Sequence, residues 1–193
     1  TLAIYHCDNV RELKYMDFAK FKNCDKIEEL NIHYVPKLYS YTMTKIPKSL
    51  EKLSIVGNFN LAKINLPSDF GNLKELTIYS NNANCEFDEN DVAKIVRSHF
   101  QNLDSLQKFV FDVKLYPKVV KVLENDLNNP VFRARFEDFA YVGEEVDGSY
   151  FETKVANFAK YDEAINKIIS RCGIQKDDSE FEAFAKIYMF ILD

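Results

Sequence analysis

The stretch from Leu50 to Leu76 reads LEKLSIVGNFNLAKINLPSDFGNLKEL, and it contains one complete repeat and the start of the next. The first copy fits the pattern L-x-x-L-x-L-x-x-N with Leu50, Leu53, Ile55 and Asn58. The pattern returns 23 positions later with Leu73, Leu76, Ile78 and Asn81. The alternating apolar residues predict a short strand that points every second side chain into the interior. The asparagine is typical of the turn that follows, because its amide group bonds nearby backbone groups.

An apolar connection joins the two predicted strands and returns the chain across the opposite side, through Ile64, Leu66, Pro67 and Phe70. One such unit cannot bury its own apolar face, so neighbouring copies must stack. The alternative is an ordinary amphipathic segment rich in leucine. The second copy, in register with the first, favours stacked parallel strands.

The repeat extends toward the N-terminus. Ile27, Leu30 and Ile32 predict a strand 23 positions before the one at Leu50, although Val35 stands where the asparagine is expected. Leu2 and Ile4 fit a further strand. Between these two strands, residues 9–23 favour a helix with one apolar face, formed by Val10, Leu13, Phe18 and Phe21. Val10, Leu13 and Tyr15 also fit the strand pattern, but the 17 positions from Val10 to Ile27 are few for a repeat.

Beyond Ile78 the spacing lengthens. Residues 88–100 predict a helix with an acidic first turn, and the next strand, at Leu106, Phe109 and Phe111, begins 33 positions after Leu73. A helix with Pro117 near its start is expected next. The segment VFRARFEDF (131–139) then alternates Phe132, Ala134 and Phe136, which favours a last strand. We therefore predict a repeat region over residues 1–139.

The remaining residues, 140–193, are predicted to form a mostly helical capping region. GEEVDGS (143–149) is typical of a turn or exposed loop, and the segment 150–158 fits a strand and a helix equally well. One helix is expected to end at Gly173, and another to begin at Ser179 or Asp178. Because the last repeat of a stacked array needs a cover with a polar outer face, this region is expected to provide it.

Charge and cysteine spacing exclude several classes of protein. The net charge is −5 and the aromatic stretches carry acidic residues, so nucleic acid is not a favoured partner. The four cysteines are far apart and show no C-x-x-C spacing, which favours buried free thiols in a reducing compartment, the cytoplasm or nucleus. No run of 18 apolar residues predicts a membrane span. An upstream segment or domain before Thr1 is expected, because the sequence opens directly in a strand pattern.

The sequence shows no constellation typical of catalysis. The three histidines are separated in sequence, and no set of three or four metal ligands can be assembled. Neighbouring residues in a strand point to opposite faces, so His6 and Cys7 are expected to diverge. Motifs that bind nucleotides or form a nucleophile elbow are missing from the sequence. We predict a protein with no catalytic residues, no metal and no cofactor, and keep an enzyme that uses His6, Cys7 or His33 as the alternative.

The repeat predicts which side chains face solvent on the strand side. One column alternates in charge, with Glu29, Lys52, Glu75 and Lys108. Two further columns carry small, aromatic and polar residues, and from them we predict a protein-binding surface: Tyr5, Asn31, His33, Ser54, Val56, Thr77, Tyr79 and Asp112. Tyrosine is favoured at protein interfaces, which supports binding. The alternative is a plain solvated face.

These motifs resemble the leucine-rich-repeat family over about residues 1–139, most closely from Ile27 to Asn81. The resemblance implies an α/β solenoid with a short parallel sheet on its concave side, helices and irregular arcs on its convex side, and recognition of a protein partner. The mixed arcs are similar to those of intracellular eukaryotic members, including substrate receptors of F-box ubiquitin ligases. The resemblance therefore implies an adaptor protein with an upstream domain that binds a ligase or scaffold component. A pathogen effector that binds a host protein is the alternative.

Overall fold

The computed structural model describes residues 1–14, 26–67, 70–80, 82, 84–102 and 105–192. The chain is an α/β protein with a mostly parallel, open sheet and several helices, so the predicted class is confirmed. It forms two compact units, Thr1–Lys154 and Val155–Asp193, and each is described by itself. The sequence-based boundary at 139/140 therefore lies inside the first unit.

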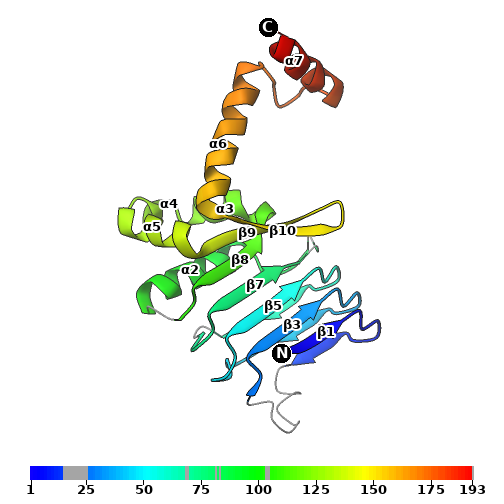
Figure 1. The fold of residues 1–193 in the computed structure, drawn as a ribbon, viewed down its shortest axis with the longest axis vertical. Coiled ribbons are helices and arrows are strands. Elements are labelled where there is room, and N and C mark those ends of the chain that lie inside the picture. The colour runs from blue at the N-terminus through cyan, green and yellow to red at the C-terminus, as the bar shows by residue number, and fades with distance from the viewer. Residues whose placement is uncertain (15–25, 68–69, 81, 83, 103–104, 193) are drawn as a thin grey trace. The chain divides into compact units, whose positions relative to one another are not determined.

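The first unit is built on a seven-stranded sheet, in which the strands lie in chain order except that β2, β4 and β6 are missing from it (Figure 1). All neighbouring strands are parallel except the last pair, which is antiparallel. The strands are β1 (Leu2–Tyr5), β3 (Glu29–His33), β5 (Lys52–Val56), β7 (Glu75–Tyr79), β8 (Lys108–Asp112), β9 (Ala140–Val146) and β10 (Ser149–Lys154).

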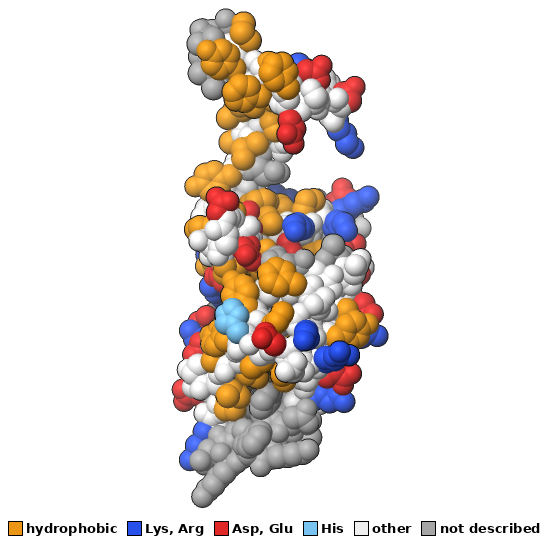
Figure 2. All heavy atoms as spheres, turned by 90° about the vertical axis from the view of Figure 1, so that its right-hand side faces the viewer, with side chains coloured by type: hydrophobic (Ala, Val, Ile, Leu, Met, Phe, Trp, Pro, Cys, Tyr) orange, Lys and Arg blue, Asp and Glu red, His pale blue; other side chains and the backbone are white. Residues whose placement is uncertain are grey.

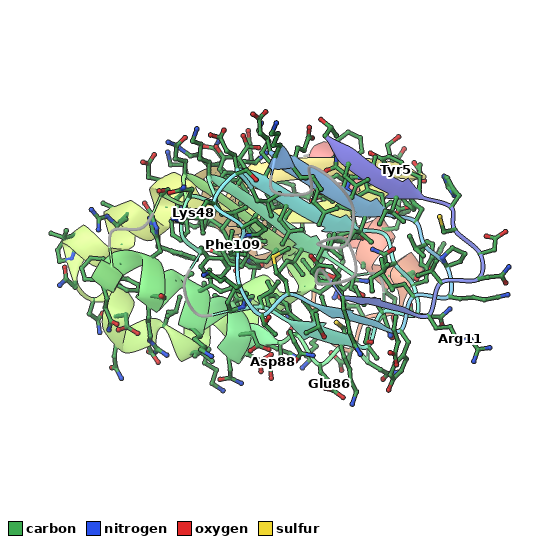
Figure 3. The ribbon with its side chains drawn as sticks, turned by 90° about the horizontal axis from the view of Figure 1, so that it is seen from below. Tyr5, Arg11, Lys48, Glu86, Asp88 and Phe109 are labelled. Atoms are coloured by element: carbon green, nitrogen blue, oxygen red, sulfur yellow. The ribbon has the colours of Figure 1, made fainter. Side chains whose placement is uncertain are left out.

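A second, three-stranded parallel sheet contains the three short strands that the first sheet omits, β2 (Glu12–Lys14), β4 (Ser40–Thr42) and β6 (Lys63–Asn65). The chain therefore passes from the first sheet to the second and back, and we call each such passage a circuit. In the later circuits helices replace the second sheet: α2 (Glu89–Asn102), the 3-10 turn η2 (Val113–Leu115), α3 (Tyr116–Val122), α4 (Glu124–Leu127) and α5 (Pro130–Phe139). Seen from below, Phe109 lies in the interior, and Tyr5 and Arg11 both lie toward the N-terminal end of the sheets, near the upper and lower edges of the view (Figure 3).

The repeat spacing sets the strand register. Leu30 pairs with Leu53 and Leu53 with Leu76, and the isoleucines two residues later pair in the same way. These side chains are all at most 2% exposed, and the aromatic pair Phe109 and Phe111 continues their rows on β8. Since each row buries large apolar groups side by side, packing between circuits stabilises the fold.

Asn58 joins two consecutive circuits. Its Oδ1 accepts a hydrogen bond from the Val35 N–H at 2.8 Å, and its Nδ2 donates to the Ile32 carbonyl at 2.9 Å. The side chain is fully buried, so both bonds are shielded from water. Asn58 thus supplies the turn at Val35, where the sequence lacks its own asparagine. The second asparagine of the motif, Asn81, lies outside the described residues.

Two local predictions are wrong, and a third is confirmed only in part. Glu12–Lys14 is a strand of the second sheet and not part of a helix, whereas Phe18 and Phe21 lie outside the described residues. The segment 131–139 is helix α5 and not a strand, with Asn129 capping its first turn. The turn or loop predicted at 143–149 is confirmed only at Asp147 and Gly148, where the hairpin of β9 and β10 turns, and the rest of the segment is strand.

The second unit contains two helices, α6 (Val155–Arg171) and α7 (Glu180–Leu192). The predicted stop at Gly173 is confirmed by its φ of +70°, and Ser179 caps α7 as predicted, because its Oγ accepts a hydrogen bond from the Glu182 N–H. Large apolar side chains of both helices are exposed, and Figure 2 shows hydrophobic side chains gathered on this unit. That the region caps the repeats remains a prediction.

Candidate functional site

The predicted columns form one face of the seven-stranded sheet, which we call the Ser54 face. Register pairs Asn31 with Ser54 and Ser54 with Thr77, and it pairs Tyr5 with His33 and Val56 with Tyr79. Asp112 lies at the end of the next strand, β8. The structure therefore brings the eight predicted residues onto five neighbouring strands.

The column of alternating charge borders this face. Its predicted members, Glu29, Lys52, Glu75 and Lys108, are paired in register. Lys52 Nζ lies 2.7 Å from Glu75 Oε1, while Lys108 is ion-paired with Glu152 of β10. Hydrogen bonds from Asn31 and Thr1 lower the pKa of Glu29. These exposed pairs fix register more than they add stability.

The N-terminal half of the Ser54 face is open. Tyr5 is 46% exposed, and Asn31, His33 and Ser54 are half-buried. His33 Nε2 lies 2.7 Å from Ser54 Oγ, and the Tyr5 ring stands edge-on to the imidazole at 5.3 Å between ring centroids. Burial lowers the pKa of His33, against a smaller upward effect of Glu29, so the imidazole is neutral near pH 7. This half offers aromatic surface and polar groups together.

A second row of rings lies one residue beyond the strand ends. His6 and Tyr34 have positive φ angles of 49° and 52°, and their rings stack 5.8 Å apart with 10° between the planes. The equivalent residue of the next circuit is Gly57, also at positive φ (+65°). The Tyr34 ring lies against it, since an added Cβ would be 2.4 Å from Tyr34 Cε1.

The C-terminal half of the Ser54 face is closed, contrary to the prediction that its residues face solvent. Val56, Thr77 and Tyr79 are at most 9% exposed. Tyr79 packs on Tyr150 of β10, with 5.2 Å between ring centroids, and burial raises the pKa of Tyr79 to about 12. Tyr150 reaches across Gly143, where an added Cβ would lie 2.4 Å from its hydroxyl oxygen.

Asp112 is half-buried and belongs to this closed half. Its Oδ1 accepts a hydrogen bond from the Lys114 N–H, which begins η2, and burial raises its pKa. The carboxylate therefore ends β8 and starts the next turn. That local role accounts for an aspartate at this position.

His6, Cys7 and His33, the residues of the alternative prediction of an enzyme, do not contact one another in the described contacts. Cys7 Sγ lies 3.4 Å from the Tyr5 carbonyl oxygen, and the His6 ring stacks on Tyr34, so the described contacts do not join the two side chains. His33 is paired with Ser54. Among the described residues, no three His, Cys, Asp or Glu side chains come together as a metal site.

The cysteines and the helices complete the comparison with the sequence. Cys7, Cys85 and Cys172 are free, as predicted, but only half-buried, and Cys24 lies outside the described residues. No described helix is long and apolar enough to cross a membrane.

The predicted binding surface does not include His6, Tyr34 or Tyr150. A signal for the first two was present, because they follow directly after the paired residues Tyr5 and His33. Tyr150 comes from a distant hairpin and shares no repeat position with Tyr79. No protein-family model, curated protein or solved structure matches this chain.

Proposed function

We propose that this chain is a leucine-rich-repeat module that binds a protein partner with the open half of the Ser54 face. The observation that carries the proposal is the cluster of exposed Tyr5 with half-buried Asn31, His33 and Ser54 on three adjacent strands. Its tyrosine and neutral histidine offer large contact area at low conformational cost, and its amide and hydroxyl offer hydrogen bonds.

The repeat-to-repeat bonds support the family part of this proposal. The buried Asn58 bonds the preceding circuit, and Asn72 Nδ2 donates to the Lys48 carbonyl of the preceding circuit at 2.9 Å. Ser49 Oγ likewise donates to the Ile27 carbonyl at 2.9 Å. Bonds that recur 22 to 26 positions apart are the expected result of stacked repeats. In a leucine-rich repeat the Ser54 face is the concave side.

A more specific role within this proposal is substrate recognition in an F-box-type ubiquitin ligase. There the Ser54 face would hold the substrate, and a segment outside the given residues would contact the ligase. Its support is the sequence resemblance.

The test compares capture of partner proteins from cells by three forms of the full chain. The double variant Tyr5→Ala/His33→Asp should weaken a specific partner's binding by about thirtyfold, as expected for loss of an aromatic hot spot. Tyr39→Ala is the matched control, because Tyr39 is 49% exposed and directly precedes β4 of the three-stranded sheet. Its N–H donates to the carbonyl of Arg11, which Figure 3 shows near the edge of the view opposite to that of Tyr5. Equal capture by the double variant and the wild type would reject the Ser54 face as the binding surface.

A further inference from the structure

A vacant strand position lies beside β6, the last strand of the three-stranded sheet. The circuits approach this sheet in the same way: the Tyr39 N–H bonds the Arg11 carbonyl at 2.7 Å, and the Ala62 N–H bonds the Tyr39 carbonyl at 2.9 Å. The Glu86 N–H continues the series by bonding the Ala62 carbonyl at 2.6 Å. A fourth strand should begin here. Instead, Asp88 caps helix α2, with its Oδ1 accepting from the Asn90 N–H at 2.8 Å.

The missing strand leaves the outer backbone of β6 open. In a parallel sheet, alternate residues bond to each side. Lys63 and Asn65 bond toward β4, through the Tyr39 carbonyl and the Met43 N–H, so the N–H and C=O of Ile64 point away from it. No described residue bonds these two groups. An unpaired strand edge is a template for another extended chain.

A groove of about 550 Å³ runs between this edge and α2. Its apolar lining comes from both sides, with Ile64, Leu66, Phe70, Phe87 and Ile95 among its residues. Leu13, Tyr41 and Ile64 are register partners, and Tyr41 is fully buried, so this row points inward. A residue added opposite Ile64 would point inward as well, toward the apolar lining.

Charged side chains on the rim of the groove add a second requirement for its ligand. Two of the charged groups are already engaged: Asp91 accepts from the Asp88 N–H, and Arg97 is paired with Asp126 at 2.8 Å. Lys94 is exposed and has no acidic partner among the described residues. An acidic side chain on the ligand would complement it.

We propose that this groove binds an extended segment of a partner protein, which adds as a parallel fourth strand beside β6. The segment carries an apolar residue, preferably β-branched, opposite Ile64 and an acidic residue that reaches Lys94. Main-chain bonds to Ile64 supply affinity, and the inward pocket and Lys94 supply specificity. This site lies on a different sheet from the Ser54 face and does not depend on its function.

The test starts with a library of random seven-residue peptides displayed on phage and selected on the full chain. Selected peptides should combine alternating apolar residues with an acidic residue. Synthetic copies should bind Lys94→Glu about fivefold more weakly than wild type, because reversal replaces an exposed ion pair by repulsion. Failure to select any peptide, or equal affinity for both proteins, would overturn the proposal.

Two further measurements separate strand addition from other binding. Ile64→Pro removes the outward N–H without removing a bond to β4, and it should weaken binding at least tenfold. Ile64→Val keeps the N–H and a β-branched side chain and should bind within about twofold of wild type. The Ile64 amide proton, followed by NMR in the wild-type protein, should exchange fast when free and slowly with peptide bound. A peptide that binds without protecting this proton, or that binds as a helix, would overturn strand addition whether or not the proline variant folds.

Discussion

Asn58 shows how much one side chain contributes when its bonds are buried. It satisfies a donor of Val35 and an acceptor of Ile32, two backbone groups of the preceding circuit. Asn72 makes a similar bond to Lys48 in the same direction along the chain, but its side chain is exposed. Water can replace the lost partner at Lys48 and cannot reach the groups at Asn58.

We therefore expect Asn58→Ala to lower the free energy of unfolding by about 3 kcal/mol, because two buried backbone groups are left unsatisfied. Asn72→Ala should cost less than about 1 kcal/mol. Urea unfolding followed by circular dichroism measures both. Similar losses in the two variants would contradict the role assigned to burial.

Asn58 also shows what the sequence does and does not predict about a single residue. The pattern around Leu50 identifies Asn58 as a turn residue from its position alone. It does not reveal that the side chain serves the turn of the preceding circuit, because that partner lies 23 positions away in sequence. When each repeat is considered by itself, the missing asparagine at position 35 does not indicate that a side chain of the next circuit completes the turn.

At the scale of elements, periodicity predicts long segments better than short ones. Strands β3, β5 and β7 follow from the 23-residue spacing, but β2, β4 and β6 have three residues each, too few to show a period. The strand prediction for helix α5 is wrong because Phe132, Ala134 and Phe136 alternate as in a strand. Phe132, Phe136 and Phe139 also have helical spacing, and all three are buried in the structure.

The N-cap residue of α5 provides a test of whether this segment is a helix. Asn129 Oδ1 accepts hydrogen bonds from the N–H groups of Val131 and Phe132, at 2.9 and 3.3 Å. Asn129→Ala should lower the free energy of unfolding by about 1 kcal/mol, the usual effect of a lost N-cap. Asn129→Asp keeps the acceptor oxygen and should stay within about 0.5 kcal/mol of wild type. If chemical denaturation ranks the two variants equally, the side chain does not cap a helix.

At the scale of the whole first unit, strand register could be predicted and solvent exposure could not. Equal spacing aligns Tyr5 with His33 and Val56 with Tyr79, as the structure has them. Burial of Tyr79 depends on Tyr150, which the β9–β10 hairpin brings across the sheet. The Asp147-Gly148 turn, with φ angles of 50° and 76°, makes that hairpin, and Asp-Gly is a local signal for it in the sequence.

Partial closure of the Ser54 face has a consequence for the pH dependence of stability. His33 lies next to the closed half, and burial lowers its pKa in the folded protein below the ordinary value of about 6.5. Between these two pKa values the unfolded chain binds more protons than the folded chain. The contribution of His33 to the free energy of unfolding is therefore fully present above about pH 6.5. It declines as the pH falls toward the pKa of His33 in the folded protein.

Replacement of His33 by asparagine should remove this contribution while keeping a polar group near Ser54. Stability measured by urea unfolding from pH 7 to pH 5 should then fall less steeply in His33→Asn than in the wild type. NMR titration of the His33 ring in the folded protein gives its pKa directly and should place it below that of an unfolded peptide. Parallel stability curves for the two proteins, or a folded pKa at or above 6.5, would contradict the conclusion that burial lowers the pKa of His33.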